Sequence, residues 1–231
     1  MIAARRRAFV LLLGAGLLLL AAALAWQRSA AVGEAGKPTL LLLTSLPLVF
    51  GEDFALDAAG SPALTALEKR YRVVPIATSS DSELRQGNLL LMAQPLAQPA
   101  EDLVALDDWV RRGGRVLLLA DPLLERPDSR PLTDPSRPPA MFMDTGLLGR
   151  WGLRLDAPEE RGTKDKRLGG QSVATVSPGT LHGTCAISGD RIVARCKVGR
   201  GFAVIVADAD WIEAEGNLDA LVAELTELER A

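Results

Sequence analysis

Short apolar runs along the chain predict the strands of a buried sheet. Most of these runs show no alternation between polar and apolar positions, which is typical of strands covered on both faces. In one run Pro75 indicates an edge strand or a strand end, because proline cannot donate a backbone hydrogen bond to a neighbouring strand. The predicted strands are residues 39–44, 72–76, 89–92, 115–119 and 202–207.

Between these runs, apolar residues recur with the period of an α-helix. Residues 99–112 place Leu103, Leu106 and Val110 on one face, and Gly113 follows the last turn as a typical C-terminal residue. The other predicted helices are residues 62–70, which follow Ser61 as an N-cap, and the amphipathic residues 218–228.

The order of these elements predicts an α/β fold with a mostly parallel sheet, because parallel strands need crossover connections that place helices on the sheet faces. We expect a three-layer sandwich of the flavodoxin-like or class I glutamine amidotransferase-like kind. Residues 121–144 contain six prolines and predict an irregular loop over the edge where the parallel strands end. Residues 146–151 predict a helical turn, and residues 184–197 predict a C-terminal β-hairpin around Gly189 and Asp190.

The start of the chain predicts a membrane anchor. Three arginines at positions 5 to 7 precede an uncharged run, and residues 9–26 would form a helix of about 27 Å, close to the ~30 Å hydrocarbon core. The arginines favour a cytoplasmic N-terminus. Small residues at 21–25 leave a cleavable signal peptide open as the alternative, and in both cases the remainder is exported. We expect a single-pass protein of the cell inner membrane with an anchor at 1–28, a linker at 29–38 and a periplasmic or extracytoplasmic domain at 39–231.

Charge and motifs exclude several function classes. The 26 basic and 29 acidic residues give a net charge of −3 with no long basic run, which argues against nucleic acid as a partner. No Gly-x-Ser-x-Gly elbow, dinucleotide fingerprint or phosphate-binding loop is present, and His182 is the single histidine. The sequence therefore predicts no catalytic residues, no cofactor, no metal site and no enzymatic activity.

The two cysteines, Cys185 and Cys196, lie on either side of the predicted hairpin turn. A two-residue loop at Asp190 and Arg191 would place them opposite each other as a disulfide candidate. A four-residue loop at 188–191 would shift the register and separate the sulfur atoms. An exported compartment favours the bridge.

Polar residues that follow the strands form a candidate binding site, since ligands of open α/β sheets bind beyond the carboxyl ends of the strands. Converging carboxylates could serve a hard cation or acid/base chemistry. The alternative is that they cap turns by accepting backbone N–H groups, as aspartates commonly do. The candidate ligand-binding or partner-binding residues are Ser45, Glu52, Asp53, Asp121 and Asp208.

Two segments resemble a known family. Residues 106–122, Leu-Asp-Asp-Trp-Val-Arg-Arg-Gly-Gly-Arg-Val-Leu-Leu-Leu-Ala-Asp-Pro, resemble the helix, Gly-Gly, strand, Asp-Pro segment in the soluble domain of ABC transporter auxiliary proteins. This group includes the gliding-motility-associated subunits. Residues 44–52 are similar to the first-strand exit of such anchored proteins, so the resemblance spans residues 39–122. It implies an amidotransferase-like sandwich that lacks the catalytic nucleophile and lies outside the membrane near a transporter.

The sequence thus predicts a non-catalytic, membrane-anchored accessory domain that contacts permease or ATPase subunits of an ABC-type system. The candidate carboxyl-edge residues would form its contact surface. An envelope hydrolase that uses the same carboxylates, and a purely structural scaffold, are the alternatives.

Overall fold

The computed structural model describes most of residues 39–231. The predicted anchor, and all of the predicted linker except its last three residues, lie outside the described residues. Thr39–Ala231 form one compact unit. Within the part of the chain that the structure describes, no helix is both long and apolar enough to cross a membrane. The described residues are 36–49, 60–128, 130–131, 134 and 137–231.

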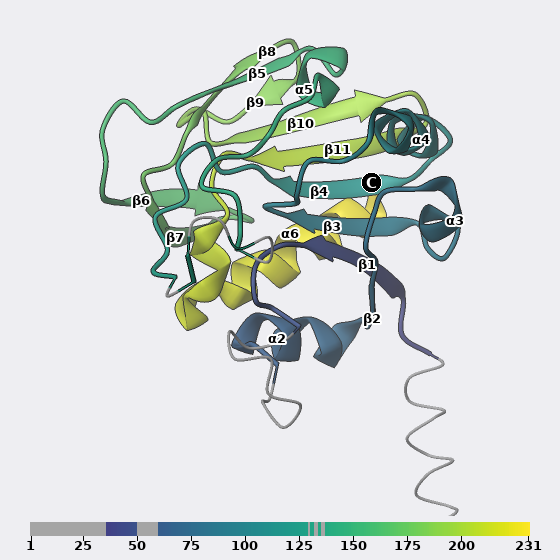
Figure 1. The fold of residues 1–231 in the computed structure, drawn as a ribbon, viewed down its shortest axis with the longest axis horizontal. Coiled ribbons are helices and arrows are strands. Elements are labelled where there is room, and N and C mark those ends of the chain that lie inside the picture. The colour runs from purple at the N-terminus through teal and green to yellow at the C-terminus, as the bar shows by residue number, and fades with distance from the viewer. Residues whose placement is uncertain (1–35, 50–59, 129, 132–133, 135–136) are drawn as a thin grey trace, which may run out of the picture. The chain divides into compact units, whose positions relative to one another are not determined.

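A seven-stranded sheet with the order β2-β1-β3-β4-β11-β10-β9 forms the centre of this unit (Figure 1). Strands β2, β1, β3, β4 and β11 are parallel, while β10 and β9 are antiparallel to their neighbours. The five parallel strands follow the 2-1-3-4-5 order of flavodoxin-like sheets. This confirms the predicted mostly parallel sheet and its antiparallel C-terminal part. The strands are β1 Thr39–Thr44, β2 Arg72–Pro75, β3 Leu89–Ala93, β4 Arg115–Leu119, β9 Ala186–Ile187, β10 Val193–Val198 and β11 Gly201–Val206.

The apolar runs form the middle of the sheet, where both faces are covered. All five residues of β3 are buried, as are the four leucines of β1 and the last four residues of β4. Strand β2, which carries Pro75, lies at the sheet edge, where the missing proline N–H costs no hydrogen bond. Burial of these aliphatic side chains is the main source of the fold's stability.

Helices cover the sheet in two pairs. Helix α2 Pro62–Arg70 packs against α6 Leu218–Arg230, and α3 Asp81–Leu84 packs against α4 Ala100–Arg111 (Figure 1). The connection from β1 to β2 runs one way along the sheet, and the connections from β2 to β3 and from β3 to β4 run the other way. Right-handed crossovers therefore place the two helix pairs on opposite faces.

A long excursion between β4 and β11 contains elements that the apolar pattern did not predict. After the proline-rich loop, the helical turn α5 Leu147–Arg150 is followed by two small two-stranded sheets. Their residues alternate or are strongly polar, as in the Thr-Lys-Asp-Lys-Arg-Leu sequence of β6, so no apolar run marks them. The sheets consist of β5 Leu153–Asp156 with β8 Thr180–Gly183, and of β6 Thr163–Leu168 with β7 Gln171–Val176.

A disulfide joins Cys185 and Cys196 across β9 and β10, with a Cα–Cα distance of 4.9 Å. Ala186 pairs with Arg195, so Cys185 and Cys196 lie opposite each other. This is the register that was predicted for a turn centred on Asp190 and Arg191. The described turn is wider than two residues, because Ser188 N–H donates to the Val193 carbonyl at 2.8 Å.

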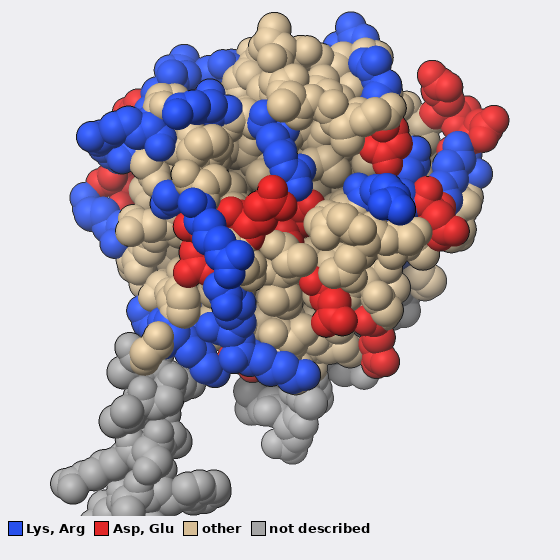
Figure 2. All heavy atoms as spheres, turned by 180° about the vertical axis from the view of Figure 1, so that it is seen from behind, with Lys and Arg blue, Asp and Glu red and all other residues tan. Residues whose placement is uncertain are grey.

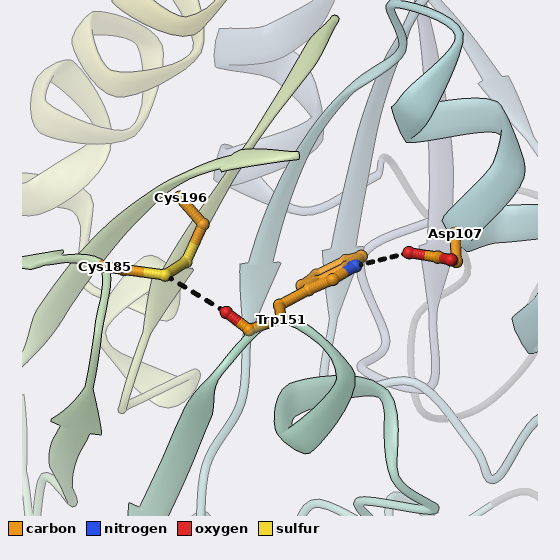
Figure 3. Close-up of a disulfide and its surroundings, with 4 residues drawn as sticks. All are labelled: Asp107, Trp151, Cys185 and Cys196. Atoms are coloured by element: carbon orange, nitrogen blue, oxygen red, sulfur yellow. Dashed lines mark hydrogen bonds between the residues drawn. A yellow bond between two sulfur atoms is a disulfide. The ribbon is translucent and has the colours of Figure 1, made fainter. Parts of the chain in front are cut away.

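The disulfide lies next to a buried polar contact (Figure 3). The Trp151 indole N–H donates to Asp107 Oδ1 on α4 at 2.9 Å, and the Trp151 carbonyl oxygen lies 3.4 Å from Cys185 Sγ. The bridged sulfur carries no proton, so this second contact is close packing. Trp151 thus connects helix α4 with the disulfide-bridged edge of the sheet.

Candidate functional site

The edge of the sheet at which the parallel strands end, the carboxyl edge, brings together most of the residues named from the sequence. Ser45 follows β1, Asp121 lies two residues beyond β4, and Asp208 lies two residues beyond β11. Glu52 and Asp53 lie outside the described residues. The described part of the site consists of residues that follow β1, β3, β4 and β11.

Ser45 contributes to the edge through a backbone contact. Its hydroxyl donates to the Gln94 carbonyl oxygen, and the preceding Thr44 hydroxyl donates to the Ala93 carbonyl at 2.8 Å. Thr44 Oγ1 also accepts the Leu46 N–H at 2.9 Å. These hydroxyls satisfy backbone groups where β1 and β3 end, so they stabilise the edge and leave little free hydrogen-bonding capacity.

Gln94, which the sequence analysis did not single out, is the central polar residue of this edge. It is fully buried and has a φ of +42°, an unusual value for a residue other than glycine. Its amide nitrogen donates to the Asp121 carbonyl at 3.2 Å and to the Pro139 carbonyl at 3.0 Å, while its amide oxygen accepts the Asp121 N–H at 3.0 Å. The position directly after the buried strand β3 was the only sequence signal for this role.

Asp121 and Asp208 are fully buried and accept backbone N–H groups. Asp121 accepts from Leu123 at 2.8 Å and from Ala209 at 3.2 Å. Asp208 accepts from Val176 at 2.9 Å and from Trp211 at 3.2 Å. The structure thus gives these two carboxyls the role of capping groups, and their burial removes them from any surface that a partner could touch.

Asp210, which is not among the residues predicted from the sequence, completes a cluster with these two residues. Carboxylate oxygens of Asp121, Asp208 and Asp210 all lie within 4.8 Å of one another. Asp210 is partly exposed, yet its Oδ1 is buried and has no hydrogen-bond partner among the described residues. Sequence spacing showed that Asp208 and Asp210 share a loop, but it did not show that Asp121 meets them.

Burial in this cluster raises the pKa values of all three aspartates. Burial is the largest cause for Asp121, whose pKa rises to about 7 although the Leu123 N–H opposes the shift. Burial and the charge of Asp210 raise the pKa of Asp208 well above its usual range. Burial also raises the pKa of Asp210, against a hydrogen bond from Asp208. The three carboxyls thus hold protons more strongly than exposed aspartates do, and a hydrogen bond between Asp208 and Asp210 raises the pKa of Asp208 while it lowers that of Asp210.

Chemically, this arrangement holds and shares protons inside the fold. The three carboxylates supply only part of the roughly six to eight oxygen ligands that a calcium ion takes, and most of their oxygens already accept N–H groups. The capping interpretation of the carboxylates agrees best with these contacts.

Comparison with other proteins shows what the fold resembles. No curated protein matches the sequence. The exo-β-1,4-mannosidase Op5Man5 from Opitutaceae bacterium strain TAV5 is 12% identical with a TM-score of 0.51, and the match covers 90% of this chain and 38% of that enzyme. The GH42 β-galactosidase Gan42B from G. stearothermophilus is 14% identical with a TM-score of 0.51, covering 87% of this chain and 33% of that enzyme. The chain spans less than two fifths of either enzyme, and at this identity the likeness concerns the fold alone.

A family model gives a more specific result. Residues 37–179, which make up more than half of the chain, match the model described as an ABC-type uncharacterized transport system. The match includes β1, the Gly-Gly turn before β4 and the proline-rich loop, and it ends at Gly179. The chain therefore belongs to the family of ABC-type uncharacterized transport system proteins.

Proposed function

We propose that this chain is a non-catalytic accessory component of an ABC-type transport system, anchored by residues 9–26 in the cell inner membrane with its domain exported. The observation that carries the proposal is the family match over residues 37–179. The permease and ATPase subunits of such a system are the expected partners.

The contacts at the carboxyl edge support a non-catalytic role. In α/β hydrolases a nucleophile occupies the strained turn that directly follows a buried strand. Here Gln94 occupies the comparable place after β3, and its amide is buried and fully engaged with Asp121 and Pro139. An amide engaged in this way is no nucleophile. This supports the proposal that the domain is an amidotransferase-like sandwich that lacks the catalytic nucleophile.

The contact surface that we propose lies beside this edge, on residues 141–143 near the end of the proline-rich loop. Phe142 N–H donates to the Asp121 carbonyl at 2.6 Å, which holds the loop against the end of β4. On either side of Phe142, Met141 and Met143 are 55% and 49% exposed, and Leu96 in the loop after β3 is 49% exposed. Flexible methionine side chains adapt well to an apolar partner surface. We therefore propose that these exposed side chains contact the partner, and that the buried Asp121 and Asp208 do not.

The test is purification of the tagged, full-length protein from membranes in mild detergent, followed by mass spectrometry of co-purifying proteins and of the protein's own N-terminus. Recovery of an ABC permease or ATPase with an intact N-terminus is the expected result. The double variant Met141→Ser and Met143→Ser should lose these partners, whereas Val104→Ser, an equally exposed apolar site on α4, should retain them. A cleaved protein that recovers no transporter subunit would contradict the proposal.

An envelope hydrolase remains the second candidate, because three carboxyls lie within 4.8 Å of one another. The partly exposed Asp210 would be the group that reaches a substrate, with Asp208 as the proton donor. Hydrolysis of glycoside or ester substrates by the wild type that disappears in Asp210→Asn would favour this candidate over the accessory role.

A further inference from the structure

A pocket of about 400 Å³ lies at the opposite edge of the sheet, the amino edge, where the parallel strands begin. Helix α3, the turn before β3 and the turn between α4 and β4 enclose it. In Figure 1 this edge is on the right, since the arrows of β3, β4 and β11 point left. Its volume falls within the ~300–1,000 Å³ that ligand pockets usually have.

The pocket wall is built by close packing of two turns. The Trp109 indole N–H donates to the Gly87 carbonyl at 3.3 Å, and the Arg115 N–H donates to the Asn88 carbonyl at 3.0 Å. A Cβ atom at Gly114 would lie 2.3 Å from the Trp109 ring, so only glycine fits there. The pocket is therefore a fixed feature of how α4 meets β3 and β4.

Three arginines and one aspartate line the pocket, which gives a net charge of +2, from three positive charges and one negative charge. Asp81 pairs with Arg85 and lies 3.6 Å from Arg112 Nη2, so one carboxylate orients two guanidinium groups. Both arginines remain more than half exposed at their side chains. They keep donors available for a ligand.

Arg115 is the third arginine that lines the pocket. Its Nε is buried and has no hydrogen-bond partner among the described residues. A buried donor without an acceptor destabilises the fold. The positions of Arg111 and Arg70 have another explanation, because both lie in the last turn of a helix, α4 and α2, where a positive charge interacts favourably with the helix dipole. Arg115 begins a strand, so the dipole does not explain it.

The surroundings of the pocket are also basic. Counted from the last residue of the preceding helix or strand to the first residue of the next strand, the segments that lead into β2, β3, β4 and β11 contain seven arginines and no acidic residue, although acidic residues outnumber basic ones in the whole chain. Figure 2 shows Lys and Arg gathered along its left side, which is this edge seen from behind. Such a concentration attracts anions over a distance of about one Debye length. The seven are Arg70, Arg72, Arg85, Arg111, Arg112, Arg115 and Arg200.

We propose that the pocket bounded by Arg85, Arg112 and Arg115 binds a phosphate group. Planar guanidinium groups match phosphate oxygens with paired hydrogen bonds, and three of them around one pocket are typical of oxyanion recognition. The phosphate can be that of a free anion or that of a phospholipid headgroup.

The experiment is isothermal titration calorimetry on the full-length protein in a neutral detergent at constant ionic strength. Two ligands are titrated separately: inorganic phosphate, and glycerophosphoglycerol, the water-soluble headgroup of phosphatidylglycerol. Arg115→Gln removes a pocket donor. The matched control Arg200→Gln removes the same charge from the same edge outside the pocket.

The expected result is saturable binding that weakens about tenfold or more in Arg115→Gln and less than about twofold in Arg200→Gln. The reason is that a hydrogen bond to a charged group contributes more to binding than the screened attraction of a distant charge. Tighter binding of glycerophosphoglycerol assigns the site to a lipid headgroup, and tighter binding of inorganic phosphate assigns it to a free anion. Arg112→Gln provides the same comparison if Arg115→Gln does not fold. Absence of saturable binding of both ligands, or equal weakening in the pocket and control variants, would overturn the proposal.

Discussion

Substitution of the buried residue Asp107 tests how much one polar contact between distant segments contributes to the stability of the fold. This residue lies on α4, is fully buried and accepts hydrogen bonds from Arg111 Nε at 2.9 Å, from Trp151 Nε1 at 2.9 Å and from Arg150 Nε. Through Trp151 it connects α4 to the disulfide-bridged edge (Figure 3). Removing this carboxylate should therefore loosen the contact between α4 and the excursion that follows β4.

The magnitude follows from the three contacts. In Asp107→Ala the buried Trp151 N–H loses its acceptor, which costs about 1–3 kcal/mol. Arg111 and Arg150 are 44% and 57% exposed at their side chains, so solvent screening reduces each ion pair to about 0.2–1 kcal/mol. We expect a total loss of about 1.4–5 kcal/mol in the free energy of unfolding. Asp107→Asn retains an acceptor for Trp151 and should lose about half as much.

Urea unfolding of the full-length protein in neutral detergent, followed by circular dichroism, measures this loss. The control is Asp108→Ala, which removes a neighbouring exposed carboxylate of the same helix and should change stability by less than about 0.5 kcal/mol. If Asp107→Ala were no more destabilised than Asp108→Ala, the connecting role of Asp107 would be refuted.

The same residue predicts a pH dependence. Burial alone would raise the pKa of Asp107, but hydrogen bonds from Arg111, Arg150 and Trp151 outweigh burial and hold the pKa below its usual value. A lowered folded-state pKa contributes stability that is present above the unfolded pKa of about 3.9 and is lost as the pH falls through the folded value. The stability difference between the wild type and Asp107→Asn should therefore shrink below about pH 4. A difference that stays constant down to pH 2 would contradict the assignment.

Three further predictions concern other parts of the fold. Reduction of the disulfide between Cys185 and Cys196, which are 11 residues apart, should lower the free energy of unfolding by about 3 kcal/mol on the loop-entropy estimate, measured by urea unfolding with and without reductant. Gly114→Ala places a methyl group against the Trp109 ring and should cost about 1–3 kcal/mol, visible as a lower Tm; an unchanged Tm would show that the ring can move away. Because the folded-state pKa of Asp121 is raised to about 7, its stabilising contribution is complete below about pH 4 and is lost as the pH rises through 7. Asp121→Asn should therefore reduce the decline in stability between pH 4 and 7 by up to about 1.4 kcal/mol per pH unit, and an unchanged slope in urea unfolding would show that Asp121 does not retain its proton.

The sequence determined the central sheet and its main helices, because buried strands and amphipathic helices leave a local signature. The runs at 39–44, 89–92 and 115–119 contain no polar face, and they form the buried strands β1, β3 and β4. The period of Leu103, Leu106 and Val110 likewise marked α4, which the structure places at Ala100–Arg111. The alternation of strands and helices then indicated the parallel arrangement, because parallel strands need crossover connections. The predicted anchor at 1–28 remains a prediction.

Only the tertiary structure decided which distant residues meet. Strands β5 to β8 are stabilised by pairing with each other, and their polar sequences carry no apolar run that would mark them. Nothing in the sequence pattern singled out Asp107, because its buried carboxylate is satisfied by Arg150 and Trp151, more than forty residues later. Contacts of this kind depend on how the turns pack.

The two edges of the sheet also show which features the sequence predicts and which depend on the tertiary structure. The sequence placed Asp121 and Asp208 at the carboxyl edge, but their burial and their contact with Asp210 decided that they cap turns and hold protons. The pocket at the amino edge escaped the sequence analysis altogether, because Arg85 and Arg115 lie 30 positions apart and converge only when β3 and β4 pair. Local patterns specify which elements form, whereas sites arise where strand order brings separate turns together.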